Sequence, residues 1–120
     1  MANGDEFVMT IPKSPYRCPP GPFERVCVVA DYLQNIKGFY NAKVTVLDEN
    51  PNIIVEETTF NNAFIDYGID YQSNCVITNV DDNIKSVTYT QGGTEYTKSS
   101  KVLNVIPRQK AAPIVFQGGL

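Results

Sequence analysis

The sequence predicts an α/β fold, namely a Rossmann-like three-layer domain with a parallel sheet and a small antiparallel β-meander. In the first half, short β-branched runs alternate with apolar residues at helical spacing, which is the pattern of βαβ units. In the second half the apolar period changes to two, and acidic or glycine-rich turns separate short runs, which is typical of antiparallel strands. With 120 residues, the chain is expected to form a single NAD(P)-binding-like domain over residues 1–120.

A strand–helix–strand unit is expected at the start. Residues 6–11 form the first strand, and a proline-rich loop leads to a helix with Gly21 at the N-cap and Pro22 at its first position. Apolar residues continue at helical spacing to Ile36, and Gly38 is expected to end the helix. Residues 43–48 are rich in β-branched side chains and are predicted to form a buried parallel strand.

The remaining elements are shorter. Thr58 or Thr59 is expected to cap a second helix that ends at Gly68. Short strands are predicted over residues 69–71, 76–80, 86–90 and 95–98, and a last strand over 102–106 returns to the parallel sheet. Residues 111–120 show no periodicity, and within them 113–120 are expected to form a poorly ordered tail.

Composition and charge exclude several classes of function. The net charge is −3 and no basic face is apparent, so nucleic acid is not an expected partner. Histidine is absent and there are three cysteines, which excludes histidine-based catalytic triads, the usual zinc sites and a Cys₄ metal site. The polar, acidic residues 1–6 do not resemble a signal peptide, so the chain is expected to be cytoplasmic or to be cut from a longer precursor.

The most informative motif is the run over residues 15–25, which holds Cys18 between Arg17 and a series of prolines. It follows the first strand and precedes the first helix, a turn that faces the ligand crevice in open α/β sheets. The positive end of the helix and the Arg17 guanidinium both favour the thiolate form of Cys18. From this local chemistry alone, a rigid turn that happens to contain a cysteine remains an alternative. Cys27, on the apolar stripe of the helix, and Cys75, near a meander strand, are interpreted as structural.

Residues 16–25, with the sequence YRCPPGPFER, closely resemble the flavoprotein subunits of flavocytochrome c sulfide dehydrogenases. These are relatives of sulfide:quinone oxidoreductases in the FAD-dependent pyridine nucleotide-disulfide oxidoreductase superfamily. The resemblance continues through residues 42–48 and 102–107 and covers about residues 5–112, as the middle NAD(P)-binding-like domain. It implies that Cys18 is one of two cysteines that form a redox-active disulfide beside the flavin, with Arg17 stabilising the thiolate.

The same resemblance implies the surroundings of the domain. It implies FAD in the full-length protein, an FAD domain in the same chain, sulfide as substrate, a cytochrome c subunit as partner and a periplasmic location. An FAD fingerprint and a suitable second redox cysteine are absent from these 120 residues. We therefore expect an excised middle domain that binds no FAD, is inactive alone and self-associates through the faces that normally pack on the FAD domain.

Two other functions remain open at this point. An NAD(H)-binding module would use Asp48, at the end of the second strand, for the ribose, although a solvated strand end is the better explanation of that carboxylate. Against this function, prolines occupy the turn that should offer glycines and free amides to the pyrophosphate. A non-catalytic interaction domain would use the proline-rich loop as its docking surface. The sequence leaves open the electron acceptor, cytochrome or quinone, and which sulfur is attacked first.

Overall fold

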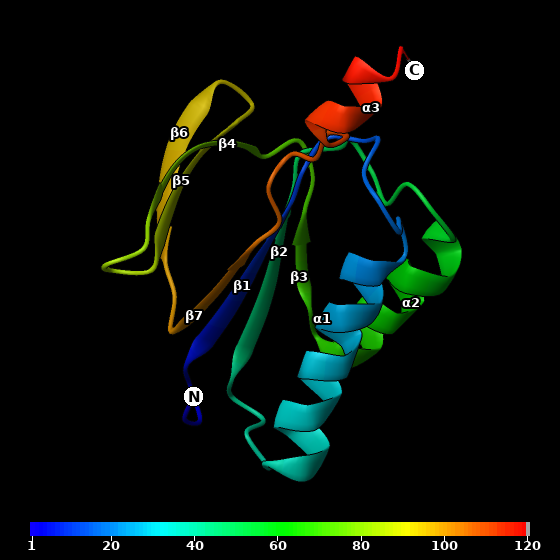
Figure 1. Cartoon of the computed structure of the whole chain (residues 1–120). Coiled ribbons are helices and arrows are strands. Elements are labelled where there is room, and N and C mark those ends of the chain that lie inside the picture. Colours follow the sequence, from blue (N-terminus) through cyan, green and yellow to red (C-terminus); the bar gives the residue numbers. More distant parts are fainter. Residues whose placement is uncertain (120) are drawn as a thin grey trace.

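Three layers make up the computed structural model, which describes residues 1–119 (Figure 1). Two helices cover one face of a parallel sheet, and an antiparallel meander covers the other face. The parallel sheet has the order β3-β2-β1-β7, formed by β1 (Glu6–Ile11), β2 (Lys43–Asp48), β3 (Asp70–Gln72) and β7 (Val102–Val105). The meander consists of β4 (Val76–Asp81), β5 (Ser86–Gln91) and β6 (Thr94–Ser99). The predicted α/β architecture is confirmed.

The central strands β1 and β2 are buried on both faces, which explains their continuous apolar runs. Strand β1 lies in the centre and pairs in parallel with β2 and β7, so that Phe7 is opposite both Val44 and Val102. Alternate side chains of β1 point to opposite layers. Met9 belongs to the core between the sheet and the helices, whereas Val8 belongs to the core between the sheet and the meander.

Helix α1 (Gly21–Asp31) starts one residue earlier than predicted. The N-cap is Pro20 and not Gly21, because Pro20 already has helical dihedral angles (φ −74°, ψ −17°), which its ring favours. At its other end α1 continues as a π-helical turn, η1 (Tyr32–Ile36), in which the Lys37 amide donates to the Tyr32 carbonyl. Gly38 then takes a left-handed conformation (φ +67°) and ends the helical segment, as predicted.

Helix α2 (Glu57–Tyr67) also starts earlier than the sequence suggests. Its N-cap is Glu56, which has a left-handed conformation (φ +45°), so the predicted cap at Thr58 or Thr59 is wrong. Both threonines lie inside the first turn of the helix. The predicted end at Gly68 is confirmed, since Gly68 has φ +66° and its amide donates to the Ile65 carbonyl.

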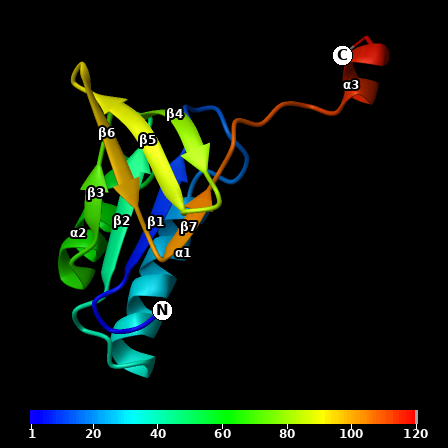
Figure 2. The same ribbon diagram turned by 90° about the vertical axis from the view of Figure 1, so that its left-hand side faces the viewer.

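The C-terminal segment leaves the sheet after β7 and contains one short helix, α3 (Pro113–Gln117), for which the sequence offered no periodicity. Pro113 fits the first turn of this helix because no amide hydrogen is needed there. Figure 2 shows α3 standing clear of the three layers. Residue 120 of the predicted tail lies outside the described residues. Among residues 1–119, no helix has both the length and the hydropathy that a membrane crossing requires.

Candidate functional site

The loop that carries Cys18 leaves the carboxyl end of β1 and enters α1, at the edge of the sheet where α/β proteins place their ligand sites. The segment after β7 and the residues after β2 lie beside this loop. The Arg17 amide donates to Oε1 of Gln109 after β7 (2.7 Å), and the Ser14 amide donates to Oδ1 of Asn50 after β2 (2.9 Å). The loop is therefore held between two neighbouring strand ends.

Cys18 is exposed and has a left-handed backbone, with φ of +54°. This conformation is uncommon for a residue other than glycine and stores roughly 1–3 kcal/mol of strain, which the surroundings must hold in place. The Cys18 carbonyl accepts from the Gly21 amide at 2.9 Å. A Cβ on Gly21 would lie 3.4 Å from the Cys18 sulfur, so the sulfur rests against the first residue of α1, at the positive end of the helix dipole.

The buried side chain of Tyr16 holds the loop together by a hydrogen bond. Its side chain is 8% exposed, and its hydroxyl donates to the Pro19 carbonyl across Cys18 (3.2 Å). Burial, followed by the charges of Asp48 and Cys18, raises the pKa of Tyr16 to about 12, so the phenol remains a donor throughout the neutral pH range. The hydrogen bond therefore closes the loop around the cysteine independently of physiological pH.

A groove of about 310 Å³ runs along the exposed side of Cys18. Its lining residues come from the loop, the start of α1 and the segment after β7: Tyr16, Arg17, Cys18, Gly21, Pro22, Arg25, Ile106 and Gln109. The structure thus brings the predicted pair, Cys18 and Arg17, to one surface. It also adds Arg25, whose guanidinium donates to Oδ1 of Asn104 on β7 at 3.0 Å.

The role of Arg25 was missed at the sequence level although a signal existed. Arg25 follows Gly21 by four residues, a spacing that puts two residues on the same face of a helix. Because the Cys18 sulfur rests on Gly21, a residue four positions further along α1 is close to the same groove. The chain as a whole is acidic, yet the groove that contains the thiol is lined by two arginines, whose positive charges attract anionic ligands.

The other two cysteines are less accessible. Cys27 is partly buried and packs against the helix-side core, and burial raises its pKa. Its place on the apolar stripe predicts burial on the inner face of the helix, but Val26 and Ala30 take the inward positions of α1 and leave Cys27 at the border of the core. Cys75 is fully buried in the meander-side core, and its pKa rises to about 11, mainly through burial and then through the charge of Asp48. Its amide donates to the Asp48 carbonyl at 2.8 Å, which places Cys75 beside the carboxyl end of β2.

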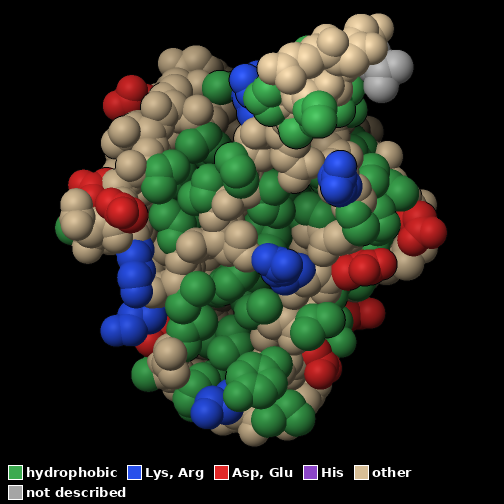
Figure 3. Space-filling view, viewed as in Figure 1, with side chains coloured by type: hydrophobic (Ala, Val, Ile, Leu, Met, Phe, Trp, Pro, Cys, Tyr) green, Lys and Arg blue, Asp and Glu red, His purple; other side chains and the backbone are tan. Residues whose placement is uncertain are grey.

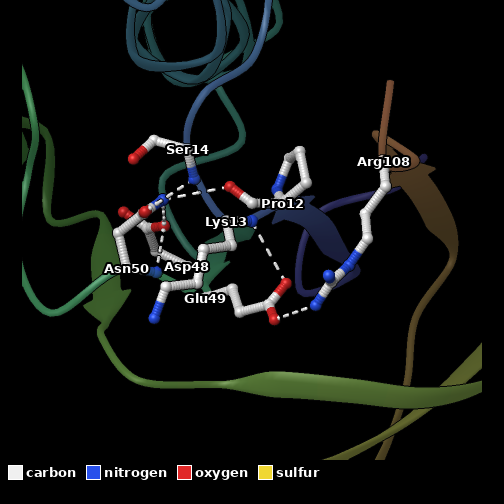
Figure 4. Close-up of polar contacts among 7 residues, drawn as sticks. All are labelled: Pro12, Lys13, Ser14, Asp48, Glu49, Asn50 and Arg108. Atoms are coloured by element: carbon white, nitrogen blue, oxygen red, sulfur yellow. Dashed lines mark hydrogen bonds and ion pairs between the residues drawn. The ribbon is translucent and has the colours of Figure 1, made fainter. Parts of the chain in front are cut away.

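Asp48 is neither a solvated strand end nor a free ribose-binding acid. Its side chain is fully buried, and its Oδ2 accepts from the Tyr71 hydroxyl at 2.6 Å. Its Oδ1 accepts from both the backbone amide and the side-chain amide of Asn50 (2.9 and 2.8 Å; Figure 4). Burial raises the pKa of Asp48 above its usual value, and these hydrogen bonds partly oppose that rise. Both carboxylate oxygens are therefore engaged inside the protein.

Within residues 1–119, no group of three or more cysteine, aspartate or glutamate side chains is arranged to hold a metal ion. The candidate site consists of the thiol of Cys18 with Arg17 and Arg25, at the groove formed by the loop and the start of α1.

The contact between Cys18 and Gly21 gives a test that separates reactivity from stability. We expect Gly21→Ala to leave the free energy of unfolding unchanged or to raise it by roughly 0.5–1 kcal/mol, because Gly21 is helical and alanine is the better helix former. The added methyl group would lie 3.4 Å from the sulfur and shield it, so alkylation of Cys18 by a bulky maleimide should slow several-fold. Denaturant titration and timed alkylation of the same sample measure both effects. Unchanged alkylation would show that the sulfur does not rest on Gly21.

Known proteins share the α/β architecture of this chain. Similar solved structures include a chain of the Tetrahymena thermophila mitochondrial ATP synthase (TM-score 0.69, 16% identity), which is matched over 98% of this chain and 30% of that chain. A pyridine nucleotide-disulfide family oxidoreductase from Enterococcus faecalis V583 has a TM-score of 0.56 and 11% identity, over 83% of this chain and 22% of that chain. A NAD-dependent persulfide reductase from A. fulgidus has a TM-score of 0.55 and 13% identity, over 83% and 20%.

At these identities the structural likeness shows the fold alone, and this chain spans less than a third of each of those chains. The family model described as "Sulfide dehydrogenase [flavocytochrome c] flavoprotein chain, central" matches residues 1–107, from the first residue to just beyond β7. The match includes the Cys18 loop and the strands around it. The chain therefore belongs to the family of central domains of flavocytochrome c sulfide dehydrogenase flavoprotein chains.

Proposed function

We propose that this chain is the central domain of an FAD-dependent sulfide dehydrogenase, and that Cys18 supplies one of its two redox-active sulfurs. One observation carries the proposal: Cys18 is exposed and conformationally strained in a groove that also contains Arg17 and Arg25. A cysteine with a purely structural role would be buried, as Cys75 is. Reactive cysteines occupy partly exposed, electropositive surroundings of the kind found here.

The chemistry of this thiol is thiol–disulfide exchange. In the oxidised protein, the Cys18 sulfur would be joined to a cysteine that lies outside these 120 residues. Hydrosulfide attacks one of the two sulfurs, a new S–S bond forms, and the old one breaks. One cysteine becomes a persulfide, and the other leaves as a thiolate that carries the electron pair of the broken bond. Arg17 and Arg25 would stabilise that negative charge and attract the anionic hydrosulfide.

The residues of this chain do not fit a dinucleotide cofactor. A dinucleotide fingerprint needs a glycine-rich turn between the first strand and its helix, with free amides for the pyrophosphate. Here the turn holds Pro15, Pro19, Pro20 and Pro22, and Asp48 is buried against Tyr71. In our proposal the flavin is therefore held by other parts of the full-length protein. The same misfit argues against the NAD(H)-binding alternative.

An exposed apolar surface supports the presence of a neighbouring domain. A hollow of about 550 Å³ lies between the outer side of α1 and the edge strand β7, lined by residues such as Val28, Tyr32, Phe39 and Val102. Val28 is 67% exposed and Ile36 69% exposed, although both are apolar. Figure 3, in the view of Figure 1, shows hydrophobic side chains gathered over the lower part of the molecule. Such a surface favours packing on the FAD domain of the same full-length chain, and self-association when the domain is alone.

The proposal extends to the partner, the location and the activity of the full-length protein. The family description names a flavocytochrome c, which supports a cytochrome c subunit as the partner that accepts the electrons. We further propose a periplasmic location for the full-length protein, where disulfides persist. The isolated chain would be inactive, because a second redox cysteine and a flavin site lie outside it.

Peptide mapping tests the role of Cys18 directly. The oxidised full-length protein is digested without reductant, before and after treatment with sulfide in the absence of an electron acceptor. We expect Cys18 in a disulfide with a distant cysteine before treatment, and one added sulfur atom on Cys18 or on that cysteine afterwards. The matched control is Cys27, which should stay a free thiol in both samples. A disulfide that excludes Cys18, or a Cys18 peptide that is free in the oxidised protein, would overturn the proposal.

A further inference from the structure

The residues that follow β2 hold the beginning of the Cys18 loop. Asn50 is 1% exposed, and its side-chain amide bonds to the loop on both sides of Lys13 (Figure 4). Nδ2 of Asn50 donates to the Pro12 carbonyl at 3.0 Å, and Oδ1 accepts from the Ser14 amide at 2.9 Å. The Asn50 side chain thus pairs with one carbonyl and one amide of the loop, as the backbone of a neighbouring strand would, although Asn50 lies beyond the end of β2.

Asn50 is itself fixed in orientation. Its second Nδ2 hydrogen is directed at Oδ1 of Asp48, and the Tyr71 hydroxyl holds the other oxygen of that carboxylate. The Asn50 carbonyl also accepts from the Asn74 amide at 2.9 Å. Because both Nδ2 hydrogens and Oδ1 have partners, a flipped amide would leave buried groups unsatisfied. The series Tyr71–Asp48–Asn50 is therefore rigid and has one arrangement.

Glu49 makes a second set of contacts that also hold the start of the loop. Glu49 accepts from the Lys13 amide through Oε2 and from the Arg108 guanidinium through Oε1 (Figure 4). Gln109 follows Arg108 and accepts from the Arg17 amide at 2.7 Å. These residues are more exposed than Asn50, and exposed ion pairs contribute little to stability, so the buried amide is the main constraint on the start of the loop, before Tyr16.

We propose that Asn50 is a positioning residue for the Cys18 sulfur, which rests on the proposed function of Cys18. The loop is fixed at Ser14 by Asn50 and at Gly21 by the start of α1. Cys18 lies between these two points in a strained left-handed conformation, which the contacts on either side of it must maintain. Asn50 thereby keeps the sulfur against α1 and beside Arg17 and Arg25, a placement that bears directly on reaction rates.

The test compares two alkylating reagents on the reduced full-length protein. Iodoacetate carries a negative charge and iodoacetamide does not, so the ratio of their rates with Cys18 reports how close the sulfur lies to the two arginines. The variants are Asn50→Ala and the milder Tyr71→Phe, which removes only the hydroxyl that holds Asp48. Their matched controls are Asn52→Ala, in the same loop but exposed, and Tyr40→Phe, whose ring is 73% exposed.

We expect Asn50→Ala to lower the ratio of iodoacetate to iodoacetamide rates several-fold and to lower kcat for sulfide oxidation about tenfold or more. Tyr71→Phe should give smaller changes of the same sign, and both controls should match the unmodified protein. Cys75 is an internal probe of unfolding because it is fully buried. A variant that loosens only the loop leaves Cys75 unreactive.

Two results would overturn this role for Asn50. One is an unchanged rate ratio in both Asn50→Ala and Tyr71→Phe. The other is a uniform acceleration with both reagents that includes Cys75, which would show a general loss of stability. The proposed function fails separately: a Cys18→Ala protein that still oxidises sulfide would exclude Cys18 from turnover. The alkylation ratio in the Asn50 variant would still report on the position of the Cys18 sulfur.

Discussion

Replacing Cys18 with glycine is expected to abolish sulfide oxidation by the full-length protein and to make this domain more stable. The backbone of Cys18 has φ of +54°, a conformation that glycine adopts without strain. Release of that strain should exceed the extra conformational entropy that glycine gives the unfolded chain, for a net gain of about 0.5–1 kcal/mol. The side chain is exposed, so little burial is lost.

Cys18→Ser is the matched control, because serine removes the thiol but keeps a Cβ on the strained backbone. Both variants should be inactive, whereas denaturant titration should show higher stability for the glycine variant alone. Turnover close to that of the unmodified protein in either variant would mean that the thiol is not used. Equal stability of the glycine and serine variants would mean that the left-handed conformation stores no strain.

Phe23→Ala is expected to have the largest effect on stability. Phe23 is fully buried, and its ring lies 5.3 Å from that of Phe60 and 6.3 Å from that of Phe64, measured between centroids. Truncating a buried phenylalanine typically lowers the free energy of unfolding by about 3–5 kcal/mol, a large share of the roughly 5–15 kcal/mol of a typical domain. Phe23 also anchors the first turn of α1, so the Cys18 groove should lose its shape.

The control for this change is Phe116→Ala in α3, where the ring is 61% exposed. It should alter the free energy of unfolding by no more than about 0.5 kcal/mol. Urea titration of both variants measures the difference. If the two variants unfold at the same urea concentration, the three phenylalanine rings do not form the main contact between α1 and α2.

The strands of the parallel sheet were predictable from sequence where short apolar runs mark them. The predicted strand over residues 43–48 coincides with β2, whose β-branched side chains are buried on both faces. The return of residues 102–106 to the parallel sheet was also predicted, and β7 pairs with β1 in that orientation. In both cases a run of apolar residues between turn residues is sufficient evidence.

Features that depend on a single backbone conformation could not be predicted in this way. The start of α2 depends on the left-handed Glu56, and glutamate gives no signal for that conformation. The π-helical turn at Tyr32–Ile36 keeps apolar residues at spacings that an α-helix also produces. In the candidate site, an exposed Cys18 on the loop was predictable, whereas its left-handed backbone was not.

The surroundings of Asp48 show why the rest of the site needed a structure. Its partner Tyr71 is 23 residues away in sequence, and the two meet only because β3 pairs with β2 in parallel, with Val46 opposite Tyr71. Sequence shows an acid at the end of a strand but not the register of the neighbouring strand. The interpretation of Asp48 as a solvated strand end was wrong because sequence does not show this pairing.

The same buried unit has an evolutionary consequence. In dinucleotide-binding domains the acid at the end of the second strand recognises the ribose, so it must face the ligand. Here Asp48 is joined to Tyr71 and Asn50, and removing either partner leaves a buried carboxylate oxygen or loop amide unsatisfied, at about 1–3 kcal/mol each. Reaching a nicotinamide-binding site would also require glycines in place of the prolines around Cys18. Single substitutions toward dinucleotide binding would therefore pass through less stable proteins, and selection would tend to keep the buried unit as it is.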